Sequence, residues 1–341
     1  MRLSPDKARA TTVDSDVLLR ALAICSVVWN HANPLALGAF GGGMTFLMML
    51  SGFSFARFSL RQASAAQVRA SLARLALRIG LPSLLLVALY FVMLQRFNWK
   101  ELLFISNWWT LDRIALFPTW YPQVMLQMFL LLGLLFLAPG ADRWLRRPAA
   151  LSLALFGAGL AMRLLLPVRA WDTAPLNHNL PHLYLWNFTL GWVVYFLSRD
   201  GHVTSTGRLA SLACIVAGAL AGWGWHRLDF WWLTIAGSLF VLVPRISLPR
   251  GLATAAGLLS QSAFTIFLLH RGLFVVLDHI VPAWKQREPL LHFLFAIVMS
   301  VGLWVLLASV SRAWREMDRE PEPRARSPQP HAAPMLPTAK A

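Results

Sequence analysis

The chain has 341 residues, of which 57% are hydrophobic and only 13% are charged, and its mean hydropathy is +0.56. Soluble domains carry about 25% charged residues, so this composition excludes an ordinary soluble enzyme and favours a polytopic membrane protein. A formal net charge of +16 would suggest nucleic-acid binding in a soluble chain. Here the basic residues lie between apolar segments, so no nucleic-acid partner is expected.

Apolar segments long enough to cross a bilayer follow one another along the chain. They predict an all-α, polytopic bundle of about ten transmembrane helices, the first of them an uncleaved span and not a signal peptide. The expected spans are 16–34, 39–57, 78–95, 119–138, 150–166, 180–197, 208–225, 229–244, 254–277 and 290–310.

Lys and Arg are far more frequent on the side of these spans that holds the N-terminus than on the opposite side. By the positive-inside rule, an even number of spans with this bias places both termini in the cytoplasm. We therefore expect a protein of the bacterial inner (plasma) membrane, in contact with its lipids. Residues 1–315 are predicted to form one transmembrane domain, and the Pro-rich segment 316–341 a disordered cytoplasmic tail.

The first expected helix carries two titratable residues, Arg20 and His31, with ten residues between them. At 100° and 1.5 Å per residue they share one helix face and lie about 16 Å apart along the axis. Such side chains are costly within a membrane unless they face a protein interior or a wet cavity, so the pair indicates a functional site. The alternatives are an Asp16–Arg20 ion pair of purely structural value and an interfacial His31 bonded only to backbone.

Two later spans supply residues suited to holding a substrate. Ser51 and Gly52 in the second span fit either a narrow tunnel wall or ordinary packing of small residues. Arg74 and Arg78, one turn apart at the start of the third, can bind either phosphate groups or anionic lipid.

Polar and aromatic residues elsewhere complete the set of candidates. Trp120 and Gln127 belong to the fourth span, His182 to the outer start of the sixth, and His270 to the ninth. No group of Cys and His has the spacing of a metal site, so no metal is expected.

Four segments of the chain follow one another as recognisable motifs: Arg20-x10-His31, FLMMLSGF at 46–53, WYPQVMLQMFLL at 120–131 and SQSAFTIFLLH at 260–270. In this order they resemble motifs of the acyltransferase 3 family, integral-membrane enzymes that transfer acyl groups from acyl-CoA to carbohydrates and other acceptors. The resemblance covers about residues 14–310. It departs from the family pattern at Met125 and Leu126, where the family has paired glutamates, and in the spacing of Arg74 and Arg78.

The resemblance implies an O-acyltransferase that uses acyl-CoA, with acetyl-CoA as the expected donor and a hydroxyl of a glycan or other cell-envelope molecule as the acceptor. It implies that His31 is the general base and that Arg20 positions the donor. The other expected donor-binding residues are Ser51, Gly52, Arg74 and Arg78, and the acceptor or supporting residues are Asp16, Trp120, Gln127, His182 and His270. The alternative is a secondary transporter of a small anion or sugar, in which intramembrane His and Arg form a relay.

Overall fold

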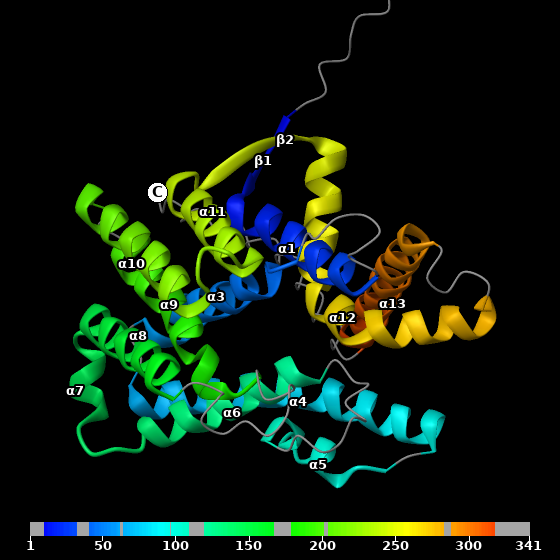
Figure 1. Ribbon diagram of the computed structural model, residues 1–341, viewed down its shortest axis with the longest axis horizontal. Helices are drawn as coiled ribbons and strands as arrows, with labels where there is room; N and C mark the ends of the chain where they lie inside the picture. Colours follow the sequence, from blue (N-terminus) through cyan, green and yellow to red (C-terminus); the bar gives the residue numbers. More distant parts are fainter. Residues whose placement is uncertain are drawn as a thin grey trace, which may run out of the picture. The chain divides into compact units, whose positions relative to one another are not determined.

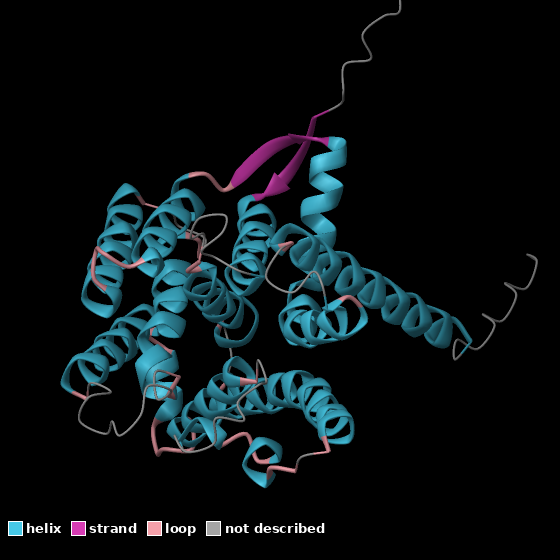
Figure 2. Ribbon diagram, turned by 45° about the vertical axis from the view of Figure 1, so that its right-hand side comes forward, coloured by secondary structure: helices cyan, strands magenta, loops and turns pink. Residues whose placement is uncertain are grey.

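The computed structural model describes residues 10–32, 41–61, 64–95, 97–108, 119–166, 179–200, 204–282 and 288–317. These segments form twelve α-helices and one two-stranded sheet (Figures 1 and 2). The helices are α1 (Ser15–Ala32), α3 (Gly43–Phe55), α4 (Ala65–Leu94), α5 (Trp99–Leu102), α6 (Trp120–Leu135), α7 (Ala141–Leu145), α8 (Pro148–Leu165), α9 (Pro181–Ser198), α10 (Ser205–Trp223), α11 (Leu228–Leu242), α12 (Arg250–Ile280) and α13 (Pro289–Met317). A π-helical turn, Ala56–Leu60, extends α3.

The expectation of a polytopic, mainly α-helical membrane protein is confirmed. Each of the ten expected spans coincides with one helix, and only the short α5 and α7 are additional among the described helices. Six helical segments are long and apolar enough to cross a membrane, and α6 and α11 are apolar but shorter. The six are Gly43–Leu60, Ala65–Val92, Pro148–Leu165, Ser205–Trp223, Arg250–Ile280 and Pro289–Ala313.

The chain divides into two units, Met1–Val301 and Gly302–Ala341. The described part of the second unit is the C-terminal part of α13, which continues through Met317. Most of the expected Pro-rich tail, 318–341, lies outside the described residues, so its disorder stays a prediction.

A small antiparallel sheet departs from the all-α expectation. Strand β1 (Ala10–Asp14) pairs with β2 (Arg245–Pro249), with Asp14 opposite Arg245. The strands are too short and too exposed for an alternating hydrophobic pattern to predict them. Because α1 follows β1 and α12 follows β2, the sheet ties the starts of these two helices together, and α1 and α12 then pack side by side (Figure 1).

Helix α9 forms the centre of the first unit, because most of its residues are buried. It approaches α3 very closely at two glycines. A Cβ atom on Gly52 would collide with the carbonyl of Phe188, and one on Gly191 with the carbonyl of Met49. This contact places α3, which carries Ser51, directly against the buried centre.

Candidate active site

The imidazoles of His31 on α1 and His270 on α12 are in direct contact. Nδ1 of His31 lies 2.8 Å from Nε2 of His270, and the rings are stacked with their planes 17° apart. His270 is completely buried, whereas His31 remains exposed. The packing of α1 on α12 thus makes one unit from the first and last of the four sequence motifs.

The backbone of α12 determines which nitrogens of this pair carry hydrogen. Nδ1 of His270 lies 2.7 Å from the carbonyl oxygen of Phe267 and 3.1 Å from that of Ile266. A carbonyl only accepts hydrogen bonds, so Nδ1 of His270 is the protonated nitrogen and its Nε2 is an acceptor. Nδ1 of His31 therefore donates to His270, and Nε2 of the neutral His31 keeps a free lone pair.

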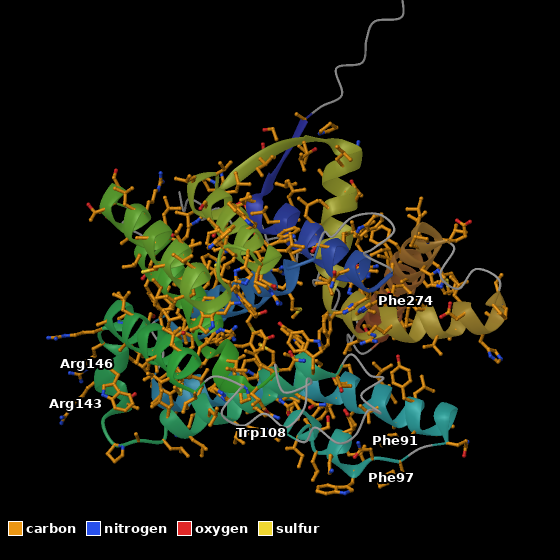
Figure 3. The ribbon with its side chains drawn as sticks, viewed as in Figure 1. Phe91, Phe97, Trp108, Arg143, Arg146 and Phe274 are labelled. Atoms are coloured by element: carbon orange, nitrogen blue, oxygen red, sulfur yellow. The ribbon has the colours of Figure 1, made fainter. Side chains whose placement is uncertain are left out.

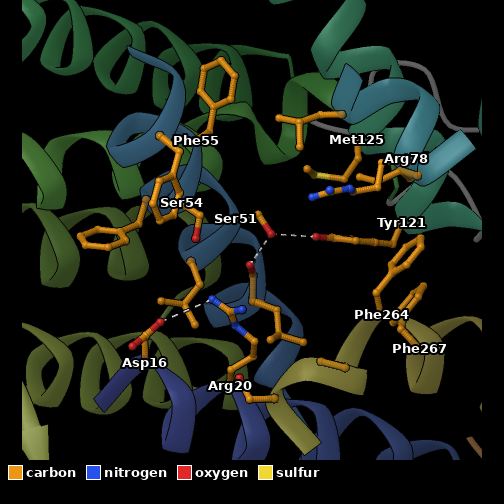
Figure 4. Close-up of a pocket in the computed structure, with 18 of the residues that line it drawn as sticks. Asp16, Arg20, Ser51, Ser54, Phe55, Arg78, Tyr121, Met125, Phe264 and Phe267 are labelled. Atoms are coloured by element: carbon orange, nitrogen blue, oxygen red, sulfur yellow. Dashed lines mark hydrogen bonds and ion pairs between the residues drawn. The ribbon is translucent and has the colours of Figure 1, made fainter. Parts of the chain in front are cut away.

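A cavity of about 660 Å³ lies between α1, α3, α4, α6 and α12; we call it the inner cavity. Arg20 and Arg78 extend into it from different walls, and Ser51 lies between them (Figure 4). Nη2 of Arg20 is 3.6 Å from Oδ2 of Asp16, and both side chains are about one third exposed. The expected Asp16–Arg20 pair is therefore present, and it borders a cavity that leaves the guanidinium accessible to a ligand.

A hydroxyl pair crosses this cavity. The Ser51 hydroxyl donates to the carbonyl of Leu47 at 2.9 Å, and the Tyr121 hydroxyl lies 3.0 Å from Ser51 Oγ (Figure 4). Because the Ser51 hydrogen is used within its own helix, Tyr121 is the donor in the second bond. Tyr121 was not among the residues that sequence reasoning selected, although it belongs to the same aromatic segment as Trp120.

Two of the expected donor-binding residues lie elsewhere. Gly52 is not among the residues that line the inner cavity, because its Cα faces α9 in the close contact described above. Helix packing, and not a place in a tunnel wall, therefore explains why position 52 is a glycine. Arg74 also lies outside the lining: it is exposed, and its Nη2 donates to Ser71 Oγ at 3.0 Å.

A second cavity of about 470 Å³, the outer cavity, contains His31. Asn30, Trp120, His226 and Asp229 also line it. Met44 and Phe267 line both the inner and the outer cavity. These two apolar side chains thus form the boundary between the cavity that contains Arg20 and the one that contains His31.

A model of the acyltransferase family, described as an acyltransferase domain, matches residues 16–309. The chain belongs to the acyltransferase 3 family. Members are membrane acyltransferases, and the match covers every helix described above up to α13. No curated protein and no solved structure matches the chain.

This acyltransferase has apolar side chains where the family motif has paired glutamates. Met125 lines the inner cavity and is 2% exposed, and Leu126 faces Gly80 on α4. Neither position offers a carboxylate to the cavity. The hydroxyls of Tyr121 and Ser51 and the guanidinium of Arg78 are among the polar groups of the same cavity.

Gln127 holds the connection between α4 and α6 in place. Its amide nitrogen donates to the carbonyl of Phe104 at 2.6 Å and to Asn107 Oδ1 at 2.8 Å, and its Oε1 accepts from Asn107 and from Trp108. These contacts account for Gln127 as a structural residue outside both cavities.

A buried acid that sequence reasoning missed lies beside this network. Glu101 is 2% exposed, and its Oε2 accepts hydrogen bonds from Thr119 at 2.7 Å and from Gln123 at 2.9 Å. No motif selects Glu101, because it belongs to a short helix in a connecting segment.

His182 lies outside both cavities, on α9 beside Arg163. The Arg163 guanidinium donates to the carbonyls of Gly222 at 2.6 Å and Leu183 at 3.3 Å, and it lies 4.4 Å from the Trp223 ring. Arg163 thus joins α8, α9 and α10, and His182 borders that junction and not the site of His31. Within the described segments, no three His, Cys, Asp or Glu residues are grouped as metal ligands would be.

Proposed function

We propose that this acyltransferase transfers an acetyl group from acetyl-CoA to a hydroxyl of a cell-envelope glycan. The observation that carries the proposal is the His31–His270 pair, which presents a free ring nitrogen in a cavity next to one that three arginines line. A neutral imidazole that is held in one tautomer is suited to act as a general base near neutral pH.

In this mechanism Nε2 of His31 removes the proton of the acceptor hydroxyl as its oxygen attacks the thioester carbonyl carbon. A new C–O bond forms, the C–S bond breaks, and the thiolate of CoA leaves. The imidazolium of His31 then returns the proton to this sulfur, which gives free CoA and restores the neutral base. His270 is a positioning residue: it accepts from Nδ1–H of His31 throughout, and it stabilises the imidazolium while it exists.

The donor reaches this base from the inner cavity. Arg20 and Arg78 offer planar guanidinium groups for the oxygens of acetyl-CoA. Since Met44 and Phe267 line both cavities, the thioester end passes between them to reach His31. The expected separation of about 16 Å along α1 agrees with Arg20 and His31 lying in two different, adjacent cavities.

We propose the orientation that the positive-inside rule predicts, with the inner cavity towards the cytoplasm and the outer cavity on the far side of the inner membrane. Contacts between connecting segments support it, because they join segments expected on the same side. The Ala65 amide donates to Asp142 at 2.7 Å, both on the expected cytoplasmic side, and Asn107 donates to the carbonyl of Asn179 at 2.8 Å, both on the outer side.

Cysteine labelling tests this orientation in a background in which Cys25 and Cys214 are replaced by Ser. A cysteine at Trp225, an exposed residue on the proposed outer side, should react with an impermeant maleimide in intact cells. A cysteine at Arg146 should react only after lysis, and the reverse pattern would contradict the orientation.

Membership of the acyltransferase 3 family favours the enzyme over the transporter hypothesis. The decisive experiment measures transfer of labelled acetyl groups from acetyl-CoA to envelope glycans by purified protein. His31→Ala should reduce transfer at least about a hundredfold, the usual effect of removing a positioned base. The matched control is His279→Ala, at an exposed position near the end of α12, which should transfer at the wild-type rate. Equal rates for His31→Ala and wild type would exclude His31 as the base.

A further inference from the structure

A third cavity, of about 500 Å³, has four arginines in its lining and lies where the small sheet meets the helix ends; we call it the basic cavity. The π-helical turn after α3, the end of α9, the end of α11 and both strands contribute to it. Its charged residues are Arg57, Arg61, Arg199, Arg245, Asp14 and Asp16. Four guanidinium groups thus surround one space with two carboxylates, although none of these arginines belongs to a family motif.

Two of the four arginines form ion pairs at the rim. Nε of Arg61 lies 3.2 Å from Oδ1 of Asp200, and Nε of Arg245 lies 3.6 Å from Oδ1 of Asp14. All four side chains are partly or largely exposed, at 52% and 29% in the first pair and 75% and 61% in the second. Exposed pairs of this kind contribute little stability, so these arginines can turn to an anion at small cost.

The other two arginines have no carboxylate partner among the described residues. Nη2 of Arg199 donates to the carbonyl of Phe240 at 2.5 Å, while its buried Nε has no hydrogen-bond partner in the segments that the structure describes. Arg57 is exposed, and its guanidinium lies 5.1 Å from the Phe58 ring centroid. A buried, unsatisfied N–H of a charged group is costly, so Arg199 indicates that this space is built for an acceptor.

Charges of both signs surround Arg199. Burial is the main effect and lowers the pKa of Arg199; Asp16, its strongest charged neighbour, and Asp14 raise this pKa, whereas Arg208 and Arg57 lower it. Asp16 is itself paired with Arg20. The excess of positive charge is therefore concentrated on Arg57 and Arg199.

The basic cavity adjoins the inner cavity. Asp16, Phe53 and Arg57 line both. An elongated ligand can therefore lie with a polyanionic end among the four arginines and a narrow arm in the inner cavity, directed towards Met44 and Phe267. This is the shape of a molecule with a phosphate-rich head and a long thin tail.

We propose that the basic cavity binds the phosphates of the nucleotide part of the acyl-CoA donor, through Arg57 and Arg199 with Arg61 and Arg245 at its rim. The inference rests on the proposed function. It assigns the phosphate contacts to the arginines of this cavity instead of to Arg74 and Arg78, which the sequence had suggested. Arginine suits the role because its planar, always charged fork matches phosphate oxygens in pairs.

Full-length wild type, Arg57→Gln and Arg61→Gln, purified in a zwitterionic detergent, are titrated with CoA by calorimetry. Each substitution should weaken CoA binding by about tenfold or more. Arg146→Gln is the matched control, because Arg146 directly follows α7 and lines none of the three cavities (Figure 3). It makes the same charge change on the same proposed side of the membrane, and it should bind CoA as wild type does.

A second donor separates the phosphate contact from the chemistry. S-Acetylpantetheine lacks the nucleotide, so the rate of transfer from it should be the same for wild type and Arg61→Gln, because Arg61 lines the basic cavity and not the inner cavity. Equal rates also show that this variant is folded. Equal CoA affinity of wild type and both variants would overturn the basic cavity as the nucleotide site, while leaving acyl transfer by His31 intact. A wild type that transfers from neither donor would instead overturn the proposed function.

Anionic lipid headgroups carry the same phosphate chemistry. CoA binding is therefore repeated in nanodiscs with and without phosphatidylglycerol. If Arg57→Gln weakens CoA binding at both lipid compositions, the result supports the basic cavity as the donor site. If Arg57→Gln reduced retention of phosphatidylglycerol but left CoA affinity unchanged, the site would be a lipid site and the proposal wrong.

Discussion

Nδ1 of His31 lies 2.8 Å from Nε2 of His270, and two backbone carbonyls of α12 hold the far nitrogen of His270. This chain of hydrogen bonds has one direction: a carbonyl accepts from His270, and His270 accepts from His31. Its consequence is that the exposed ring of the pair, His31, carries the basic nitrogen, while the buried ring only orients it.

The first prediction concerns that division of roles. His270→Phe removes the acceptor for Nδ1 of His31, and it should lower kcat about tenfold to a hundredfold, the usual effect of losing a group that orients a catalytic histidine. The KM for acetyl-CoA should change little. The double variant with His31→Ala should be no slower than His31→Ala alone, because the two residues act as one unit. Additive losses would mean that His270 acts independently of His31.

Substitution of Arg20 should weaken binding of the acetyl-CoA donor and leave folding unchanged. Arg20→Lys keeps the charge but loses the planar fork, so the KM for acetyl-CoA should rise about tenfold while the protein level and Tm stay near wild type. Asp16→Asn is the control: it removes a partly exposed ion pair with a contact of 3.6 Å, worth less than about 1 kcal/mol. A larger KM effect for Asp16→Asn than for Arg20→Lys would contradict a direct role of Arg20.

The boundary between the inner and outer cavities should control passage of the acyl group. Met44→Trp narrows it, and we expect a lower kcat with butyryl-CoA than with acetyl-CoA, while CoA affinity measured by calorimetry stays unchanged. Met299→Trp makes the same change at a position on α13 that is 49% exposed, and it should leave both rates unaltered. Equal slowing of both donors by Met44→Trp would show that the acyl chain does not pass this residue.

The contact between α3 and α9 predicts a stability difference between two glycine substitutions. Gly191→Ala places a methyl group against the Met49 carbonyl and the backbone of α3, and forced overpacking of this kind costs about 1–3 kcal/mol. A Cβ on Gly157 of α8 meets nothing within 4 Å, so Gly157→Ala should gain about 0.5–1 kcal/mol from helix propensity. Thermal unfolding in detergent should therefore give a lower Tm for Gly191→Ala and an equal or higher one for Gly157→Ala. Equal Tm values would show that α3 and α9 separate without cost.

The sequence by itself determined the class of the protein and pointed to the helix that carries the proposed catalytic residues. Charged residues are too few for a soluble surface, and apolar segments of membrane length recur along the chain, so ten of the described helices could be located in advance. Arg20 and His31 could be paired because helix geometry relates residues on one helix without any knowledge of the fold. The family motifs extended this to His270, Ser51 and Trp120.

Only the tertiary structure decided which of these residues meet. The hydrogen bond between His31 and His270 joins positions 239 apart in the chain, and no local periodicity encodes such a distance. A motif includes Gly52, but only the close contact with α9 explains why a glycine is needed there. Likewise, only the packing of the helices brings the Tyr121 hydroxyl to Ser51. The four arginines of the basic cavity come from three separate segments, because Arg57 and Arg61 belong to the same turn. In the sequence, each of these arginines looks like an ordinary cytoplasmic positive charge, because charge bias indicates only the side of the membrane. The packing of helix ends and strands is what brings such charges together in one site.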